Sequence, residues 1–190
     1  NSLGSMAVAA VTAGNKISMF FCCPFDALGS TMATYGGQNV GAGKLERIGQ
    51  GLKSCVLLGA GYSVIALGIS TLFGESLAGL FLEASETAII GDAKLFLTIA
   101  TAFYFPLALV NIIRFLIQGV GFPFFAILAG VFEMVARALA GFVLVPWLGF
   151  TGSCLGNPIA WILADVFLIP AFFLVQKRLR NMKECGIKEG

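Results

Sequence analysis

Five apolar stretches in this sequence are each long enough to cross a membrane as a helix. The hydrocarbon core of a bilayer is about 30 Å thick and takes about 20 apolar residues in helical form. The composition agrees, because 58% of the 190 residues are hydrophobic and 12% are charged, whereas a typical soluble domain has roughly 25% charged residues. The sequence therefore predicts an all-α, polytopic transmembrane helix bundle. We expect one domain over residues 1–190, with spans at 7–38, 45–73, 93–118, 123–144 and 157–176.

The chemistry-bearing residues argue against several functional classes. Histidine is absent, so a Ser-His or Cys-His catalytic pair cannot form within this chain. The net charge of +2 is small and the basic residues are not interleaved with aromatic ones, which argues against a nucleic-acid partner. The five cysteines lack any metal-binding spacing. We therefore expect neither an enzyme nor a resident cofactor or metal.

Basic residues in the connecting segments predict the orientation of the chain, because cytoplasmic loops are enriched in Lys and Arg. The first connection and the tail at 177–190 are basic, whereas segment 74–92 is mostly acidic and segment 146–156 is uncharged. The predicted multi-pass topology in the cell inner (plasma) membrane has a cytoplasmic C-terminal tail and an external chain start. An odd span count with an external start indicates part of a longer transporter-sized protein. Lys94 and Arg114 are expected to extend toward lipid headgroups.

Polar side chains in the first span recur every three or four residues and so predict one polar stripe on a helix. An ionised group at membrane depth costs about 2.5 to 3.5 kcal/mol or more, so Lys16 and Asp26 need partners or a cavity. They lie about 15 Å apart along a helix axis and cannot pair with each other. The stripe should face protein or water. Its members are Thr12, Lys16, Met19, Cys23, Asp26, Ser30 and Thr34.

Four polar residues in the later spans are also candidates for function. Glu133 and Arg137 are four residues apart with the acid first, so they should pair on one face of a helix. This pair either locks helix packing or opens during transport. Asn111 either bridges two helices or contacts a ligand. Asp165 lies near the middle of the last span, and a central carboxylate there is a functional hypothesis by default.

Several segments resemble one transporter family in the order in which they occur. The segment 36–47, Gly-Gly-Gln-Asn-Val-Gly-Ala-Gly-Lys-Leu-Glu-Arg, is similar to the loop after the eighth helix of the multidrug and toxic compound extrusion (MATE) transporters. The residues Ala13-Gly14-Asn15-Lys16-Ile17 resemble the start of that helix. Further resemblance lies in Gln118-Gly119-Val120-Gly121, in Glu133 with Arg137, in 146–152, and in Asn157-Pro158-Ile159-Ala160-Trp161 through Asp165.

The resemblance implies helices eight to twelve of a twelve-helix antiporter, without helix seven and the N-terminal lobe. Such transporters export small amphipathic or cationic compounds in exchange for H⁺ or Na⁺, so the expected partners are these substrates, membrane lipid and the N-terminal lobe. A carboxylate can bind a proton, or coordinate Na⁺ transiently with neighbouring oxygens. Asp26 and Glu133 are the leading candidates and Asp165 is the third. The other expected cavity residues are Arg137, Lys16, Asn111 and Asn15.

Two other functions compete with this interpretation. A lipid-linked oligosaccharide flippase of the related superfamily should line its cavity with several cations for a pyrophosphate, and only Lys16, Arg114 and Arg137 qualify. A membrane-embedded assembly subunit without transport activity would need no more than five spans. The ordered resemblance favours the exporter.

Overall fold

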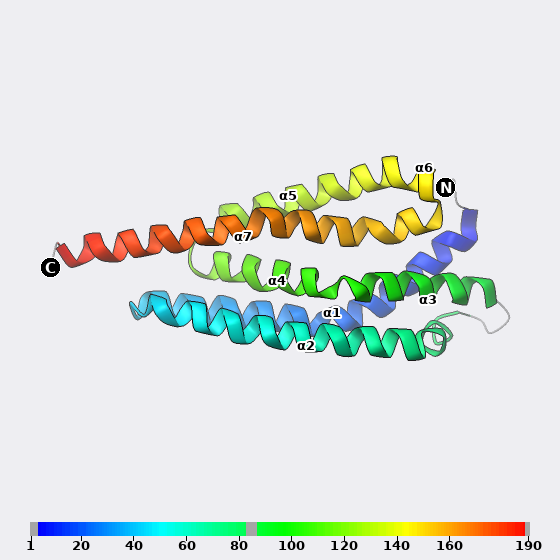
Figure 1. Cartoon of the computed structure of the whole chain (residues 1–190), viewed down its shortest axis with the longest axis horizontal. Coiled ribbons are helices and arrows are strands. Elements are labelled where there is room, and N and C mark those ends of the chain that lie inside the picture. The colour runs from blue at the N-terminus through cyan, green and yellow to red at the C-terminus, as the bar shows by residue number, and fades with distance from the viewer. Residues whose placement is uncertain (1–3, 83–86, 189–190) are drawn as a thin grey trace.

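The structure is a computed structural model that describes residues 4–82 and 87–188. Within these ranges the chain is a bundle of helices and contains no strand, which confirms the predicted all-α class (Figure 1). The elements are α1 (Gly4–Gly41), α2 (Leu45–Ala78), α3 (Thr87–Ala102), α4 (Tyr104–Gly119), α5 (Pro123–Leu139), the π-helix η1 (Ala140–Leu144), α6 (Val145–Leu148) and α7 (Phe150–Lys188).

Four continuous helical segments of the described chain are long and apolar enough to cross a membrane, and a bent pair supplies a fifth. The bent pair is α3 and α4, which meet at 52° where the sequence predicts a single span over 93–118. The break lies at Phe103, whose backbone leaves the helical region. Pro106 follows in the first turn of α4. Proline has no N–H to donate to the carbonyl of Ala102, so the helix breaks just before it.

The last helix is much longer than the predicted span over 157–176, and the predicted connection over 146–156 is mostly helical. Gly149 makes the turn with a φ of 57°, a left-handed conformation that glycine adopts readily. Helix α7 starts at the next residue and continues through the predicted tail as far as Lys188. Its first turn packs closely because Gly152 lies against the backbone of Leu144. A side chain at position 152 would have no space there.

A π-helical turn interrupts the fourth span after Leu139. The amide of Val145 donates to the carbonyl of Ala140, five residues back. Pro146 follows directly and has no N–H to continue the α-helical pattern. The span nevertheless extends to Leu148, four residues beyond the predicted end at 144.

The connections gather at two opposite ends of the bundle (Figure 1). The α1–α2 turn, the α4–α5 turn and the C-terminal part of α7 share one end, whereas the start of α1, the end of α2, the start of α3 and the α6–α7 turn share the other. The basic residues of the first connection and of the tail therefore lie at the same end, as the predicted orientation requires. At the opposite end Lys94 forms an ion pair with Glu75 at 2.9 Å.

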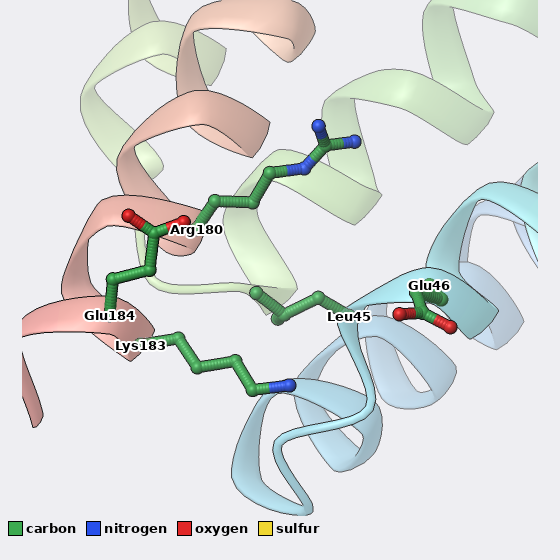
Figure 2. A pocket seen from close by; sticks show the side chains of 5 residues that line it. All are labelled: Leu45, Glu46, Arg180, Lys183 and Glu184. Atoms are coloured by element: carbon green, nitrogen blue, oxygen red, sulfur yellow. The ribbon is translucent and has the colours of Figure 1, made fainter. Parts of the chain in front are cut away.

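At the basic end, α7 is joined to the α1–α2 turn. The Lys183 ammonium group donates to the carbonyl of Gly43 at 2.7 Å. A cavity of about 520 Å³ lies beside this contact, between the start of α2 and the end of α7. Its lining residues are Leu45 and Glu46 from α2 and Arg180, Lys183 and Glu184 from α7 (Figure 2).

Helix α4 is the centre of the bundle and packs against α1, α2, α5 and α7. Its side chains Ile112, Leu116 and Ile117 are fully buried. The closest helix contact is with α1, where Gly119 lies against the backbone of Ala33 and Gly37 faces the Gly119 carbonyl. Small residues allow helix backbones to approach in this way. The glycines of the two family-like segments therefore meet each other in space.

A buried tyrosine fixes the bend between α3 and α4. The Tyr104 hydroxyl group forms a 2.7 Å hydrogen bond with the Ser18 hydroxyl group of α1. Its ring packs against Phe25 and Trp161, with centroids 5.5 Å and 6.1 Å away. Aromatic contacts of this kind contribute about 0.5 to 1.5 kcal/mol beyond simple burial. Tyr104 thereby joins α1, α4 and α7 at the level of the bend.

Much of the outer surface is apolar, which suits contact with lipid. Unlike a soluble protein, the bundle exposes long rows of large hydrophobic side chains on α2 and α5. These include Leu57, Leu58, Val64, Leu72, Phe124, Ile127 and Met134, together with Phe142 of η1.

Candidate functional site

The polar stripe of α1 lies on an exposed face of the bundle. Its seven members, Thr12, Lys16, Met19, Cys23, Asp26, Ser30 and Thr34, are all exposed. Buried residues such as Ile17, Phe25 and Met32 occupy the opposite side of the helix and contact the core. We call these seven residues the polar face of α1. The sequence predicts that this face contacts either protein or water. None of the described helices covers it.

Asp26 is held in place on the polar face by a neighbouring helix. The Asn111 side-chain amide of α4 donates to Asp26 Oδ1 at 3.2 Å. Asn111 is therefore a bridge between α1 and α4, one of the two roles that the sequence allows. The other carboxylate oxygen of Asp26, Oδ2, accepts no hydrogen bond from the described residues. An exposed carboxylate with one fixed oxygen can bind a cation with the other.

Hydroxyl groups continue the polar surface toward the basic end of the bundle. Thr31 donates to the carbonyl of Ala27 at 2.8 Å, and Thr34 donates to the carbonyl of Ser30 at 3.1 Å. Since both protons are used within the helix, the oxygens remain available as acceptors. An open depression of about 450 Å³ lies here, lined by Ser30, Thr31, Thr34, Tyr35 and Gln38.

A second polar region is buried between α4, α5 and α7. Glu133 pairs with Arg137 at 3.0 Å, the geometry predicted from their spacing. The structure adds Arg114 of α4, whose guanidinium contacts the other oxygen of Glu133. Arg137 Nε also donates to the Asn157 side-chain carbonyl at 3.1 Å. The carboxylate of Glu133 is therefore held on both oxygens by guanidinium groups.

The contact of Arg114 corrects the prediction that this side chain extends toward lipid headgroups. Its side chain is only 22% exposed and points into the bundle toward Glu133. A guanidinium group in a bundle interior needs an anion, and Glu133 supplies one. The sequence alone offers no signal for this pair, because the two residues lie on different helices whose relative rotation is set by packing.

Asp165 of α7 lies next to this pair and is 93% buried, with a residue exposure of 7%. Its Oδ1 atom accepts no hydrogen bond from the described residues, and Arg114 Nε is likewise buried without an acceptor among them. Asp165 and Arg114 are close enough to interact electrostatically. We call Arg114, Glu133, Arg137 and Asp165 the charged cluster.

A groove of about 270 Å³ gives the charged cluster an opening toward α1. Asn15 of α1 shares this groove with Arg137 of α5 and with Ser153 and Asn157 of α7. Asn15 is therefore brought to the charged cluster, and not to Asp26. Lys16 is exposed on the polar face and forms no ion pair with the described residues.

The acidic residues do not gather into a metal site. Within the described parts of the chain no group of three acidic or cysteine side chains could hold a metal ion. The candidates instead divide between two places. Asp26, Lys16 and Asn111 belong to the polar face or its support, whereas Glu133, Arg137, Asp165 and Asn15 belong to the charged cluster and its groove.

These features define a multi-pass membrane protein that keeps charged side chains at membrane depth, as transport proteins do. The sequence matches the MatE family over residues 1–143, which is most of the chain. The chain therefore belongs to the MatE family. No curated protein matches the sequence significantly.

Solved MATE transporters share the fold. The crystal structure of MATE in complex with MaL6 aligns with a TM-score of 0.82 and 20% identity, over 95% of this chain and 40% of that one. An outward-facing multidrug resistance MATE family transporter of the MOP superfamily gives the same four values. An inward-facing one gives a TM-score of 0.79 and 19% identity, over 96% and 43%. This chain therefore spans about two fifths of the length of these transporters.

Proposed function

We propose that this chain forms most of the C-terminal lobe of a secondary active transporter that exports amphipathic or cationic compounds in exchange for H⁺ or Na⁺. The observation that carries the proposal is the exposed Asp26 carboxylate at the depth of a membrane span, on a face that the described helices leave open. Family membership supports a transporter. In the plasma membrane, the basic end would face the cytoplasm, and the N-terminal lobe would cover the polar face.

Asp26 is suited to bind the positive part of an amphipathic substrate. A carboxylate shielded from bulk water attracts an organic cation more strongly than one in water, because the effective dielectric is lower. Asn111 fixes Oδ1 and leaves Oδ2 for the ligand. Exposed Met19 and Phe20 on the same side of α1 offer apolar contact. The face thus combines one charge with an adaptable apolar surface.

The flippase alternative is weakened by the arrangement of the cations. Arg114 and Arg137 are both engaged with Glu133. That leaves Lys16 as the cation on the polar face, and a pyrophosphate would call for several. The assembly-subunit alternative is weakened by the match to the MatE family.

The test replaces Asp26 in the full-length transporter and follows efflux of the fluorescent organic cation ethidium from cells. Asp26→Asn keeps the shape and removes the charge. We expect efflux to fall about tenfold or more, because a hydrogen bond to a charged group contributes about 1.5 to 3 kcal/mol.

Glu46→Gln is the matched control, because it also removes an exposed carboxylate, at the start of α2 and away from the polar face. Its efflux should equal that of the wild type. Normal efflux by Asp26→Asn would reject the role of Asp26, and no efflux by the wild type would reject the exporter function.

A further inference from the structure

The charged cluster contains two carboxylates that differ in how they are satisfied. Both oxygens of Glu133 are bound by guanidinium groups, one from Arg114 and one from Arg137. Protonation of Glu133 would weaken both of these ion pairs, because each depends on the negative charge of the carboxylate. Glu133 is therefore a fixed anion, which argues against its predicted part in ion exchange.

Asp165 has the opposite character. It is 93% buried, with 7% exposure, and its Oδ1 atom accepts no hydrogen bond from the described residues. A buried acceptor without a partner raises the free energy of the folded state. Protonation of Asp165 would remove the buried charge while leaving Arg114 paired with Glu133. Asp165 can thus gain and lose a proton without breaking an ion pair of the cluster.

The surroundings of Asp165 favour a proton over Na⁺. The charged group that acts on Asp165 is Arg114 from α4, which in turn contacts Glu133 of α5. Sodium requires several oxygen ligands, whereas the charged neighbour of Asp165 is a guanidinium, which repels a cation. The other helices that pack against α7 contribute charges elsewhere. Asp92 and Lys94 lie in the first half of α3, and Lys16 and Asp26 lie on the polar face of α1.

The groove beside the charged cluster brings an opening of the bundle to Arg137. The Arg137 side chain is 45% exposed at this groove and also contacts Glu133 inside the bundle. Asn15, Ser153 and Asn157 line the same groove with polar atoms. Water in the groove can therefore approach the cluster from the side of α1.

We propose that Asp165 is the group that binds and releases the coupling proton, and that Arg114 is a positioning residue held in place by Glu133. On loading, a hydronium ion gives its proton to Asp165 Oδ1 and leaves as water; on release, the proton returns to water and the carboxylate again balances Arg114. In an exchanger, Asp26 binds the cationic substrate after Asp165 has released its proton, so that substrate and proton cross in alternate steps. This inference rests on the proposed exporter function.

The experiment uses the full-length transporter in proteoliposomes with ethidium as the probe. Two readouts are compared: accumulation driven by an imposed pH gradient, and exchange of ethidium across the membrane at equal pH. For the wild type we expect the pH gradient to drive accumulation and a sodium gradient alone to drive none. Asp165→Asn should lose pH-driven accumulation and keep exchange at equal pH.

Each other outcome rejects a different statement. Full pH-driven accumulation by Asp165→Asn overturns the assignment of Asp165, and so does loss of exchange by a variant that is still monodisperse in detergent, since that indicates a structural role. Accumulation driven by sodium alone overturns the choice of the proton but not the exporter function. No ethidium transport by the wild type rejects the exporter function, and this inference with it.

A second variant covers the case in which Asp165→Asn does not fold. Asp165→Glu keeps a carboxyl group but moves it by one methylene relative to Arg114. We expect it to retain pH-driven accumulation with a shifted midpoint in its dependence on external pH. An unchanged midpoint would overturn the proposal, because a proton-binding group must respond to its changed environment.

Discussion

The polar face of α1 and the charged cluster represent two ways in which a membrane helix can carry charge. In the cluster, guanidinium groups from α4 and α5 bind both oxygens of Glu133, and only Asp165 Oδ1 and Arg114 Nε are buried without a partner among the described residues of the cluster. On the polar face, Lys16 and Asp26 are exposed, and Asp26 has a hydrogen bond from Asn111. Charges at membrane depth need either partners or water. We therefore expect the cluster to stabilise the bundle, whereas the proposed function assigns the polar face to contact with substrate or with the rest of the transporter.

The largest effect on stability should come from removing the central anion of the cluster. Glu133→Gln leaves Arg114 and Arg137 without their shared carboxylate. Breaking a buried ion pair by removing one partner costs about 3 to 5 kcal/mol, because an uncompensated charge stays buried. We expect a large fall in the thermal unfolding temperature of the full-length protein in detergent, measured by scanning fluorimetry.

Glu75→Gln is the control for this comparison, because Glu75 pairs with Lys94 at an exposed site at the end of the bundle opposite the basic residues. Exposed ion pairs contribute little, so its unfolding temperature should stay close to that of the wild type. Equal unfolding temperatures for Glu133→Gln and the wild type would show that the cluster does not stabilise the lobe.

A smaller effect on stability is expected at the close contact between α4 and α1, the helix that carries the polar face. Gly119→Ala places a methyl group against the backbone of Ala33, which cannot move aside as a flexible side chain could. Overpacking of this kind costs about 1 to 3 kcal/mol. Gly130→Ala in α5 is the control, since its methyl group would meet open space. A lower unfolding temperature for Gly119→Ala alone would confirm the close approach of α1 and α4, and equal values for both variants would contradict it.

The smallest effect on stability is expected for the hydrogen bond on the polar face. Asn111→Ala removes the donor to Asp26, and hydrogen bonds between membrane helices contribute about 0.6 to 2 kcal/mol. The unfolding temperature should fall slightly, while the ethidium affinity of the full-length transporter should change more clearly because the Asp26 carboxylate is no longer fixed. A stability loss as large as that of Glu133→Gln would contradict the expectation that the polar face contributes less to stability than the charged cluster.

The sequence predicts the features of this fold that depend on composition and on spacing within one helix. The all-α class, the position of the polar stripe and the Glu133–Arg137 pair all follow from helical periodicity. Contacts between helices do not, because they depend on relative rotation. The sequence therefore predicts that Arg114 extends toward lipid headgroups, whereas in the structure it contacts Glu133.

Local backbone chemistry accounts for the other differences between prediction and structure. Pro106 is the sequence signal for the bend at Phe103. Some prolines are accommodated within membrane helices, however, and the apolar pattern does not show which of them break the helix. The early start of α7 depends on the single turn residue Gly149. A count of hydrophobic residues cannot locate either feature.

The bond between Lys183 and the Gly43 carbonyl has a consequence for how the lobe sits in a membrane. The last helix is fastened to the first hairpin at the basic end. The basic residues of the last helix therefore lie at the same end of the bundle as those of the first connection, such as Lys44 and Arg47. These basic residues would bind anionic lipid headgroups at one membrane surface. Their binding would set how deep the polar face and the charged cluster lie in the bilayer.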